Sequence, residues 1–370
     1  MVRRDLAGAA AALEKAVLAS DDDPALWMKL AGVRRATGHP SEALDAVHKA
    51  LAIAPRDFTA LLMRASLLQR LGRPEAGEAW GHALAQKPSS AVPDELERVI
   101  AEAQRHHEAW LAEREAVLVD RMSSAEQRAD EEQRRRIARF RTNALRRTRA
   151  FHSEPTDYHF PELTEREFHP RRLFPWIEEI EAATDTIRDE LRHVMAEERA
   201  ELVPYVQFDE HVPMDQWRAL NKSADWTAIH LVQHGRVIEA NARHCPTTMT
   251  LLKKVPQPVV RGASPNAMFS LLAPRTEIPP HVGISNTRLV CHVPLIVPEG
   301  CWFRVGAETR RWKPGEAFVF DDTMEHEAAN SSDDLRVVLI FDVWHPDLSD
   351  VEREAAAALI GASGAPSAAL

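Results

Sequence analysis

Apolar residues follow two distinct patterns along the chain, one helical and one typical of strands. Over roughly the first 90 residues the apolar positions have helical spacing, and equivalent positions lie 34 residues apart. Trp27 and Leu61 form one such pair, and Gly38 and Gly72 form another. A 34-residue period in paired helices is the tetratricopeptide signature. The pattern therefore predicts stacked helical repeats over residues 1–92, with an ordinary helical hairpin bundle as the alternative.

Short apolar and β-branched runs dominate the last third of the chain. Turn residues separate them, namely Pro-Glu-Gly at residues 298–300 and Lys-Pro-Gly at residues 313–315. Closely spaced strands of this kind favour a jelly-roll or cupin-like barrel over a sheet with crossover helices. The mouth of such a barrel can hold a ligand. The predicted strands cover residues 289–297, 301–305, 317–320 and 337–343.

Good helix formers fill the region between these two parts. Asp94 is one predicted helix start, and Ser123 with Glu126 has the form of a capping box, which indicates another. Residues 134–149 carry eight arginines, but acidic residues precede them, which favours a solvated helix over nucleic-acid binding. A polar helix is expected over residues 173–201, packed outside the barrel. The predicted division is repeats over 1–92, a helical connector over 93–151, the barrel domain with flanking helices over 152–350, and an Ala-rich tail over 351–370.

Composition restricts the location and the partners of the protein. With 370 residues and 45% hydrophobic content the chain can bury a sizeable core, and its net charge of −10 gives no general attraction to nucleic acid. No run approaches the roughly 18 apolar residues of a membrane span, and Asp5 and Glu14 interrupt the one weak match to a signal peptide. Cys245, Cys291 and Cys301 have no paired spacing, so we expect a reducing, cytoplasmic location.

Three motifs stand in and beside the strand-rich segment. His281 lies in Pro-His-Val-Gly-Ile-Ser-Asn-Thr-Arg-Leu at residues 280–289, His326 ends Phe-Asp-Asp-Thr-Met-Glu-His, and Asp-Val-Trp-His-Pro occupies residues 342–346. In this order and spacing the motifs resemble the aspartyl/asparaginyl β-hydroxylase family, over roughly residues 202–348. The resemblance implies a double-stranded β-helix that binds Fe(II) and 2-oxoglutarate and consumes O2. Animal members of the family also carry tetratricopeptide-like repeats ahead of the catalytic domain.

The resemblance also implies roles for single residues. His281 and His326 correspond to the two iron ligands, and imidazole suits ferrous iron. Arg336 corresponds to the arginine that binds the distal carboxylate of 2-oxoglutarate, which a guanidinium group can hold in two parallel hydrogen bonds. Ser270 and His292 correspond to further cosubstrate contacts. Without the resemblance, each of these residues could be an ordinary hydrogen-bonded interior residue, or for Arg336 a member of a surface ion pair.

Gly283 stands where many related oxygenases carry a third, carboxylate ligand. Aspartyl hydroxylases likewise lack that carboxylate and leave water in its place, although an open position could also admit halide for halogenation. Asp321 and Asp322 could orient a ligand or a bound water, or could simply shape a turn. A structural role at the end of a strand is expected for three residues of the third motif, namely Asp342, His345 and Pro346.

The resemblance suggests hydroxylation of an unactivated carbon, namely the β-carbon of Asp or Asn in a peptide that the repeats could present. Val290, however, replaces an arginine that helps the animal enzymes to bind an acidic substrate, and this weakens the preference for Asp. A small molecule or a lipid therefore stays open as the substrate. A non-catalytic scaffold, with repeats that bind a partner and a barrel that senses 2-oxoglutarate, is the alternative from another class of function.

Overall fold

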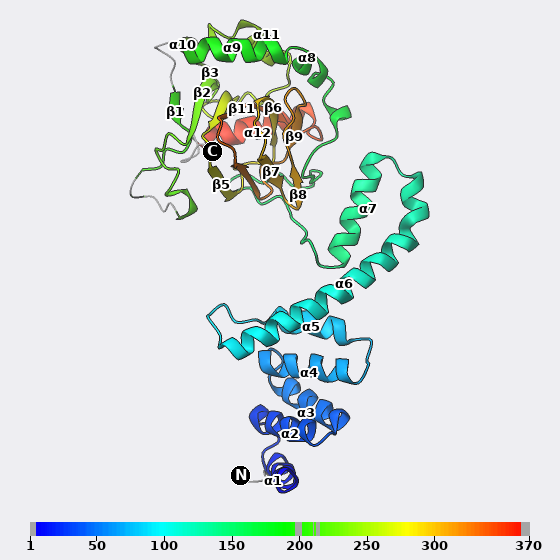
Figure 1. The fold of residues 1–370 in the computed structure, drawn as a ribbon. Helices are drawn as coiled ribbons and strands as arrows, with labels where there is room; N and C mark the ends of the chain where they lie inside the picture. The colour runs from blue at the N-terminus through cyan, green and yellow to red at the C-terminus, as the bar shows by residue number, and fades with distance from the viewer. Residues whose placement is uncertain (1–4, 197–201, 210, 212–214, 364–370) are drawn as a thin grey trace. The chain divides into compact units, whose positions relative to one another are not determined.

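The chain forms two compact units in a computed structural model, Met1–Thr148 and Arg149–Leu370 (Figure 1). The structure describes residues 5–196, 202–209, 211 and 215–363. The finer limits predicted at residues 92, 151 and 350 stay a prediction. Within the described part of the chain, no helix is both long enough and apolar enough to cross a membrane.

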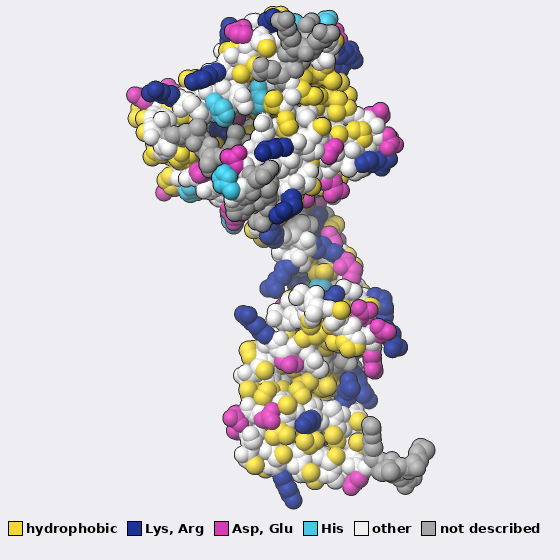
Figure 2. Space-filling view, turned by 90° about the vertical axis from the view of Figure 1, so that its left-hand side faces the viewer, with side chains coloured by type: hydrophobic (Ala, Val, Ile, Leu, Met, Phe, Trp, Pro, Cys, Tyr) yellow, Lys and Arg dark blue, Asp and Glu magenta, His cyan; other side chains and the backbone are white. Residues whose placement is uncertain are grey.

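Consecutive helices build the first unit, and each packs against the next along the chain. Alanines fill much of the buried contact between them, which lets the helices approach closely. Hydrophobic side chains also gather on the face of this unit that Figure 2 shows. The helices are α1 (Leu6–Ala19), α2 (Pro24–Ala36), α3 (Pro40–Ile53), α4 (Phe58–Arg70), α5 (Ala76–Leu84), α6 (Asp94–Arg128) and α7 (Glu131–Ala144).

The 34-residue period is visible in the ends of the helices. The side chains of Asp23 and Asp57, which are 34 positions apart, accept backbone N–H groups at the starts of α2 and α4. Gly38 and Gly72 follow the ends of the same helices with φ of 85° and 64°, a conformation that costs glycine little. Equivalent residues therefore begin and end equivalent helices, and the predicted repeat architecture is confirmed.

The predicted helix start at Ser123 is wrong. The hydroxyl of Ser123 donates to the carbonyl of Asp120 at 2.7 Å inside α6, so it does not compete with the helix for a backbone N–H group. The helix continues to Arg128 and the chain turns at Ala129. Asp130 then forms the capping box that begins α7.

Two antiparallel sheets form the second unit, so the predicted jelly-roll architecture is confirmed. The strands are β1 (Leu202–Pro204), β2 (Trp226–Gln233), β3 (Arg236–Val237), β4 (Ala267–Leu272), β5 (Thr276–His281), β6 (Arg288–Ile296), β7 (Cys301–Val305), β8 (Glu308–Arg310), β9 (Phe318–Phe320), β10 (His326–Asn330) and β11 (Arg336–Trp344). The larger sheet has the order β1-β2-β4-β11-β6-β9, with β3 paired to β2, and the smaller sheet has the order β5-β10-β7-β8.

Helices cover the outer face of the larger sheet (Figure 1). The predicted helix over residues 173–201 is split, because α8 ends at Ala182 and the Thr184 hydroxyl at the start of α9 donates to the Glu181 carbonyl. Residues 197–201 of that prediction lie outside the described residues, as do residues 364–370 of the Ala-rich tail. The helical elements of the unit are η1 (Arg171–Leu173), α8 (Ile177–Ala182), α9 (Thr184–Ala196), η2 (Asp215–Trp217), α10 (Glu239–Ala242), α11 (Pro246–Leu252) and α12 (Asp350–Ala362).

Strand β11 lies between β4 and β6 and separates two cores. Its residues alternate between the two faces of the sheet, as the pleat requires. Leu339 and Phe341 pack outward in the core beneath the helices. Val338 packs inward between the sheets, and Ile340 and Asp342 line the cavity there. The inner face of the larger sheet therefore positions the candidate site.

Candidate active site

His281 and His326 are brought together by strand pairing. His281 ends β5, His326 begins β10, and the two residues face each other in the antiparallel register. Their ring centroids are 4.0 Å apart. In each ring Nδ1 contacts a carbonyl two residues earlier, that of Pro279 at 2.7 Å and that of Met324 at 3.1 Å. Because these contacts place the ring proton on Nδ1, Nε2 of each ring keeps its lone pair.

Burial keeps both of these rings neutral. It lowers the pKa of His281 well below the usual value and lowers that of His326 to about 4, because a charged imidazolium is poorly solvated there. Neutral imidazole is the form that binds a metal. The structure brings the two predicted ligands together, but among the described residues no third His, Cys, Asp or Glu completes a group of three metal-binding side chains. The ligand role of the pair stays a prediction.

The space beside Gly283 is filled by a neighbouring carboxylate. A Cβ atom built at Gly283 would lie 2.2 Å from Oδ2 of Asp322. Oδ1 of the same carboxylate is buried and has no hydrogen-bond partner among the described residues. Asp322 therefore brings a carboxylate to this side of the histidine pair from the turn after β9.

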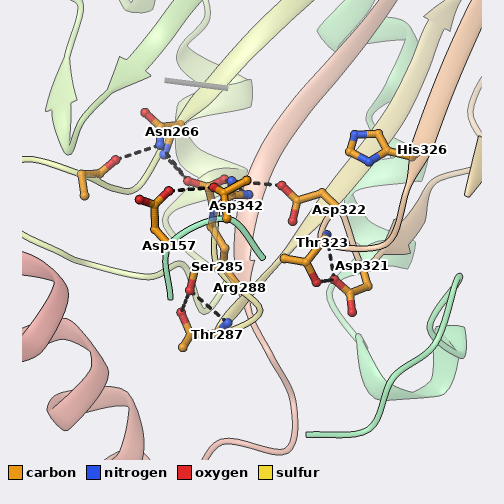
Figure 3. A network of polar contacts seen from close by, with 12 residues as sticks. Asp157, Asn266, Ser285, Thr287, Arg288, Asp321, Asp322, Thr323, His326 and Asp342 are labelled. Atoms are coloured by element: carbon orange, nitrogen blue, oxygen red, sulfur yellow. Dashed lines mark hydrogen bonds and ion pairs between the residues drawn. The ribbon is translucent and has the colours of Figure 1, made fainter. Parts of the chain in front are cut away.

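Arg288 forms two buried ion pairs, and one of them holds Asp322 in place. Its guanidinium lies between two carboxylates, 3.0 Å from Asp322 and 3.3 Å from Asp342 (Figure 3). Asp342 also accepts hydrogen bonds from the backbone and the side chain of Asn266. Burial raises the pKa of each carboxyl group, and the Arg288 charge opposes that rise. Arg288 is therefore already paired, and Asp342, which lines the cavity from within β11, helps to hold it in place.

Asp321 shapes a turn instead of facing the histidines. Its carboxylate accepts the backbone N–H of Thr323 at 2.9 Å and the hydroxyl of the same residue at 2.5 Å. Burial raises the pKa of Asp321 to about 7, while these hydrogen bonds act in the opposite direction. Of the two adjacent aspartates, Asp322 lies beside the candidate metal site.

Arg336 is a buried cation without a carboxylate partner in the described structure. It is 1% exposed, and its Nε has no hydrogen-bond partner among the described residues. Its Nη1 lies 3.4 Å from both the carbonyl and the hydroxyl of Ser270, and its guanidinium lies 4.9 Å from the centre of the Trp312 ring. Burial lowers its pKa to about 10, so the group is still charged at neutral pH. A positive charge this poorly compensated suits an anionic ligand.

Ser270 and His292 lie on the strands that flank β11. Ser270 is paired in register with Val338, and its hydroxyl accepts the indole N–H of Trp226 at 3.1 Å. His292 is buried, and the indole N–H of Trp312 points at its Nδ1 over 3.4 Å. Burial and the nearby Arg336 charge lower the pKa of His292, which keeps the ring neutral.

All five sequence-predicted site residues line one cavity of ≈ 240 Å³. The structure shows that these five residues meet at one cavity. Their roles as metal or cosubstrate contacts stay predictions. Two tryptophans form aromatic walls of this cavity that the sequence does not indicate. Trp226 follows Asp225, and Trp312 stands between Arg311 and Lys313, so no local pattern places either beside the site. The ion pairs of Arg288 are likewise not indicated by the sequence, although the arginine lies inside the first motif.

His345 of the third motif lies away from the cavity. It is 1% exposed, its Nε2 points at the carbonyl of Thr164 at 3.3 Å, and its ring packs against that of His169 with centroids 5.1 Å apart. Its role is therefore structural, as expected for this motif.

The fold and the site together define a double-stranded β-helix with a two-histidine candidate metal site. Residues 181–346 match the model of the aspartyl/asparaginyl beta-hydroxylase family, and residues 24–67 match a tetratricopeptide repeat. The chain therefore carries a domain of this family together with repeats of a kind that commonly binds other proteins.

Curated relatives resemble parts of the chain. The human aspartyl/asparaginyl beta-hydroxylase is 37% identical over 143 residues, 38% of this chain and 18% of that protein. Human aspartate beta-hydroxylase domain-containing protein 2 is 37% identical over 136 residues, 36% of this chain and 37% of that protein. The ornithine lipid ester-linked acyl 2-hydroxylase of Rhizobium tropici is 35% identical over 176 residues, 47% of this chain and 58% of that protein. The chain thus spans less than two thirds of each, and the similarities support a hydroxylase domain.

Proposed function

We propose that the second unit is a hydroxylase that depends on Fe(II) and 2-oxoglutarate. The observation that carries the proposal is the buried, uncompensated charge of Arg336 in the same cavity as two neutral, paired histidines. An anionic cosubstrate would supply the partner that this guanidinium lacks. The metal would use the lone pairs that His281 and His326 keep on Nε2.

The donor set fits a ferrous ion. Two neutral imidazoles are suitable ligands, and because they occupy only two positions they leave room for a chelating cosubstrate and for oxygen. When bound, iron and 2-oxoglutarate would supply the oxidising chemistry, in which one oxygen atom of O2 is inserted into a C–H bond and the other enters succinate. Asp322 Oδ1 is free to accept a hydrogen bond in the space beside Gly283. Hydroxylation with water at that position is our proposal, in preference to halogenation.

The cosubstrate end of the cavity is matched to a dicarboxylate. Arg336 and Ser270 offer donors to its distal carboxylate, and His292 lies beside them on β6. The Trp226 indole orients the Ser270 hydroxyl, and Trp312 stacks on the guanidinium. These aromatic rings also keep water away from the charged pair, which strengthens the attraction between its members.

For the substrate, the family similarity supports the β-carbon of an Asp or Asn residue in a peptide or protein. The repeats of the first unit are suited to binding such a partner. A second candidate is a lipid acyl chain. It is favoured by the similarity to the Rhizobium acyl hydroxylase, which covers a larger share of both chains than the human matches do. We also propose a reducing, cytoplasmic location, since Cys245, Cys291 and Cys301 are all free and buried.

The test is anaerobic loading of the full chain with Fe(II), followed by addition of O2 and 2-oxoglutarate. Succinate formation should require iron and should rise when peptides or lipids from a cell extract are present. The product should gain the mass of one oxygen atom derived from O2, in chloride-rich and in chloride-free buffer alike. Binding of 2-oxoglutarate without any succinate under all of these conditions would instead support the sensing scaffold.

A further inference from the structure

One row of inward-facing side chains crosses the larger sheet beside the candidate site. Met268 on β4 is paired in register with His230 on β2 and with Ile340 on β11. Ile340 is in turn paired with His292 on β6. All four residues line the cavity. The row therefore leads from the cosubstrate end at His292, across two apolar side chains, to His230 at the other side of the sheet.

The part of the cavity beyond the cosubstrate end offers no uncompensated positive charge. Of the described residues that line the cavity, the only arginines or lysines are Arg288 and Arg336. Arg288 is paired with two aspartates, and Arg336 is assigned to the cosubstrate. The lining carboxylate of Glu327 is paired with Arg304. An anionic substrate group buried here would lose its hydration without gaining a partner, so the geometry selects against it.

His230 supplies a polar group at the far end of the row. Nε2 of its ring lies 3.5 Å from the amide nitrogen of Gln233. In the tautomer with the ring proton on Nδ1, Nε2 can accept from this amide nitrogen, which only donates. Nδ1 is buried and has no partner among the described residues. Burial lowers the pKa of His230 to about 4, so the ring is neutral at pH 7. A neutral N–H donor is left without an acceptor, and a carbonyl oxygen would satisfy it.

Two apolar side chains line the cavity on the side of α12. They are Val260 and Ile360, which belong to one hydrophobic cluster. The residues next to them in the chain, Val259 and Leu359, are 75% and 60% exposed. An apolar chain that left the cavity past Val260 and Ile360 would therefore emerge near exposed apolar side chains.

We propose that His230 is a substrate-positioning residue, and that its Nδ1–H donates to the carbonyl oxygen of an uncharged acyl chain. The alkyl part of this chain lies along Met268, Ile340 and Val290 and leaves the cavity past Val260. This assignment rests on the proposed hydroxylase function and names the substrate class for the same site. An acyl chain fits this row better than an asparagine peptide, whose polar backbone would have to lie against Met268 and Ile340.

The probes for the first experiment are hexanamide, hexanoate and hexane, with the full chain, 2-oxoglutarate and no iron. Binding can be followed by tryptophan fluorescence, since Trp226 and Trp312 line the cavity. At pH 7.5 hexanamide should bind at least tenfold more tightly than hexanoate, because only the amide avoids burying a charge. Equal affinities for these two probes would overturn the proposal. So would tighter binding of N-acetylasparagine N-methylamide than of hexanamide, because that result assigns the cavity to a peptide.

A pair of variants separates the hydrogen bond from packing. His230→Phe should weaken hexanamide about fivefold to tenfold, the size of one neutral hydrogen bond, and should leave hexane binding unchanged. His230→Asn, which keeps a donor, should recover part of the loss. His193→Phe is the matched control, because His193 is exposed on α9 and does not line the cavity. An equal loss for hexane and hexanamide in His230→Phe would mean that the ring only fills space, and the positioning role would be wrong.

Reversal of the charge preference is the final test. Met268→Lys, or Ile340→Lys if the first variant does not fold, introduces an uncompensated cation on the apolar row. Either variant should bind hexanoate more tightly than hexanamide, and retention of the wild-type order in a folded variant contradicts the proposal. Because these readouts contain no iron, they are independent of turnover. Correct binding preferences without any succinate formation would overturn the proposed hydroxylase function and leave the binding assignment standing.

Discussion

The carboxylate of Asp322 occupies the space that any side chain at Gly283 would need. A Cβ atom at residue 283 would lie 2.2 Å from Oδ2 and 2.5 Å from Cγ of Asp322. Gly283 is not among the residues with positive φ, so its backbone does not require glycine. The requirement is for space, and it links the absence of a ligand at residue 283 to the presence of a buried carboxylate at residue 322.

This relationship predicts a coupling between two substitutions. Gly283→Ala should lower the free energy of unfolding by about 1–3 kcal/mol through overpacking. In an Asp322→Ala background, where the clashing atoms are absent, the same substitution should cost much less. Denaturant unfolding of the four proteins measures the coupling. Gly361→Ala is the control, since its Cβ would meet its nearest neighbour at 3.6 Å. Equal costs of Gly283→Ala in both backgrounds would show that the clash relaxes freely.

The paired histidines predict the metal dependence. His281→Ala or His326→Ala should abolish Fe(II)-dependent turnover of 2-oxoglutarate, because a single remaining imidazole cannot hold the ion at the site. Mn(II) binding, measured by calorimetry, should be lost in parallel, while circular dichroism should show unchanged helical content. His193→Ala, on the exposed side of α9, serves as the control. Normal turnover in either of the first two variants removes the metal assignment.

Arg336 predicts a difference between arginine and lysine. Arg336→Ala should weaken 2-oxoglutarate about 100-fold or more, about 3 kcal/mol, because it leaves a buried carboxylate unpaired. Arg336→Lys should recover only part of this, since an ammonium group cannot form two parallel hydrogen bonds to a carboxylate. Equilibrium dialysis with labelled 2-oxoglutarate would measure both. The control is Arg275→Ala, which removes an exposed surface pair with Asp333. Unchanged affinity in Arg336→Ala contradicts the cosubstrate assignment.

His169 predicts a component of the acid sensitivity of the fold. Both of its ring nitrogens are buried without a hydrogen-bond partner among the described residues, and burial, with the neighbouring His345, lowers its pKa to about 3. The unfolded chain, with a pKa near 6.5, takes up this proton first. Stability from His169 is therefore present above pH 6.5 and is lost as the pH falls towards 3, at about 1.4 kcal/mol per pH unit.

The measurement is the free energy of unfolding of His169→Phe and of the wild type between pH 5 and pH 7. The wild type should lose about 2 kcal/mol more than the variant between pH 6.5 and pH 5. His193→Phe should keep the wild-type slope. Parallel curves for His169→Phe and the wild type would show that the ring is already solvated in the folded protein.

The fold could be predicted from the sequence wherever a single local pattern determines the secondary structure. Strands β6 and β11 are mostly apolar runs, and the repeats carry a fixed period. Strand β5, Thr276–His281, was missed because its two adjacent prolines argue against a strand. It is formed nevertheless, since it pairs with β10 on one side only and lies at the edge of the smaller sheet. An edge strand of this kind forms because of tertiary pairing, which no local sequence pattern indicates.

The candidate site shows the same division. His281, His326 and Arg336 could be named because they lie in motifs with fixed spacing. The partners that set their chemistry could not, because they come from distant strands: Trp226 reaches Ser270 from β2, and Trp312 stacks on Arg336 from the segment after β8. These contacts depend on the order of the strands in the sheets, and that order cannot be read from a single sequence.

Arg288 predicts a defect whose size depends on pH. Arg288→Met should remove the cation between Asp322 and Asp342 and leave two buried carboxylates near each other, at a cost of about 3–5 kcal/mol at pH 8. Without the arginine charge, the pKa of these carboxyl groups in the folded variant should rise further above the unfolded value. The folded variant then binds more protons than the unfolded chain, so its stability falls as the pH rises through the raised pKa. The difference in unfolding free energy between wild type and variant should consequently grow from pH 5 to pH 8, and Asp322→Asn in the Arg288→Met background should reduce it.

Arg275→Met, at an exposed pair, should cost less than about 0.5 kcal/mol at any of these pH values. A penalty for Arg288→Met that stays constant with pH would show that the two carboxylates are compensated by other groups.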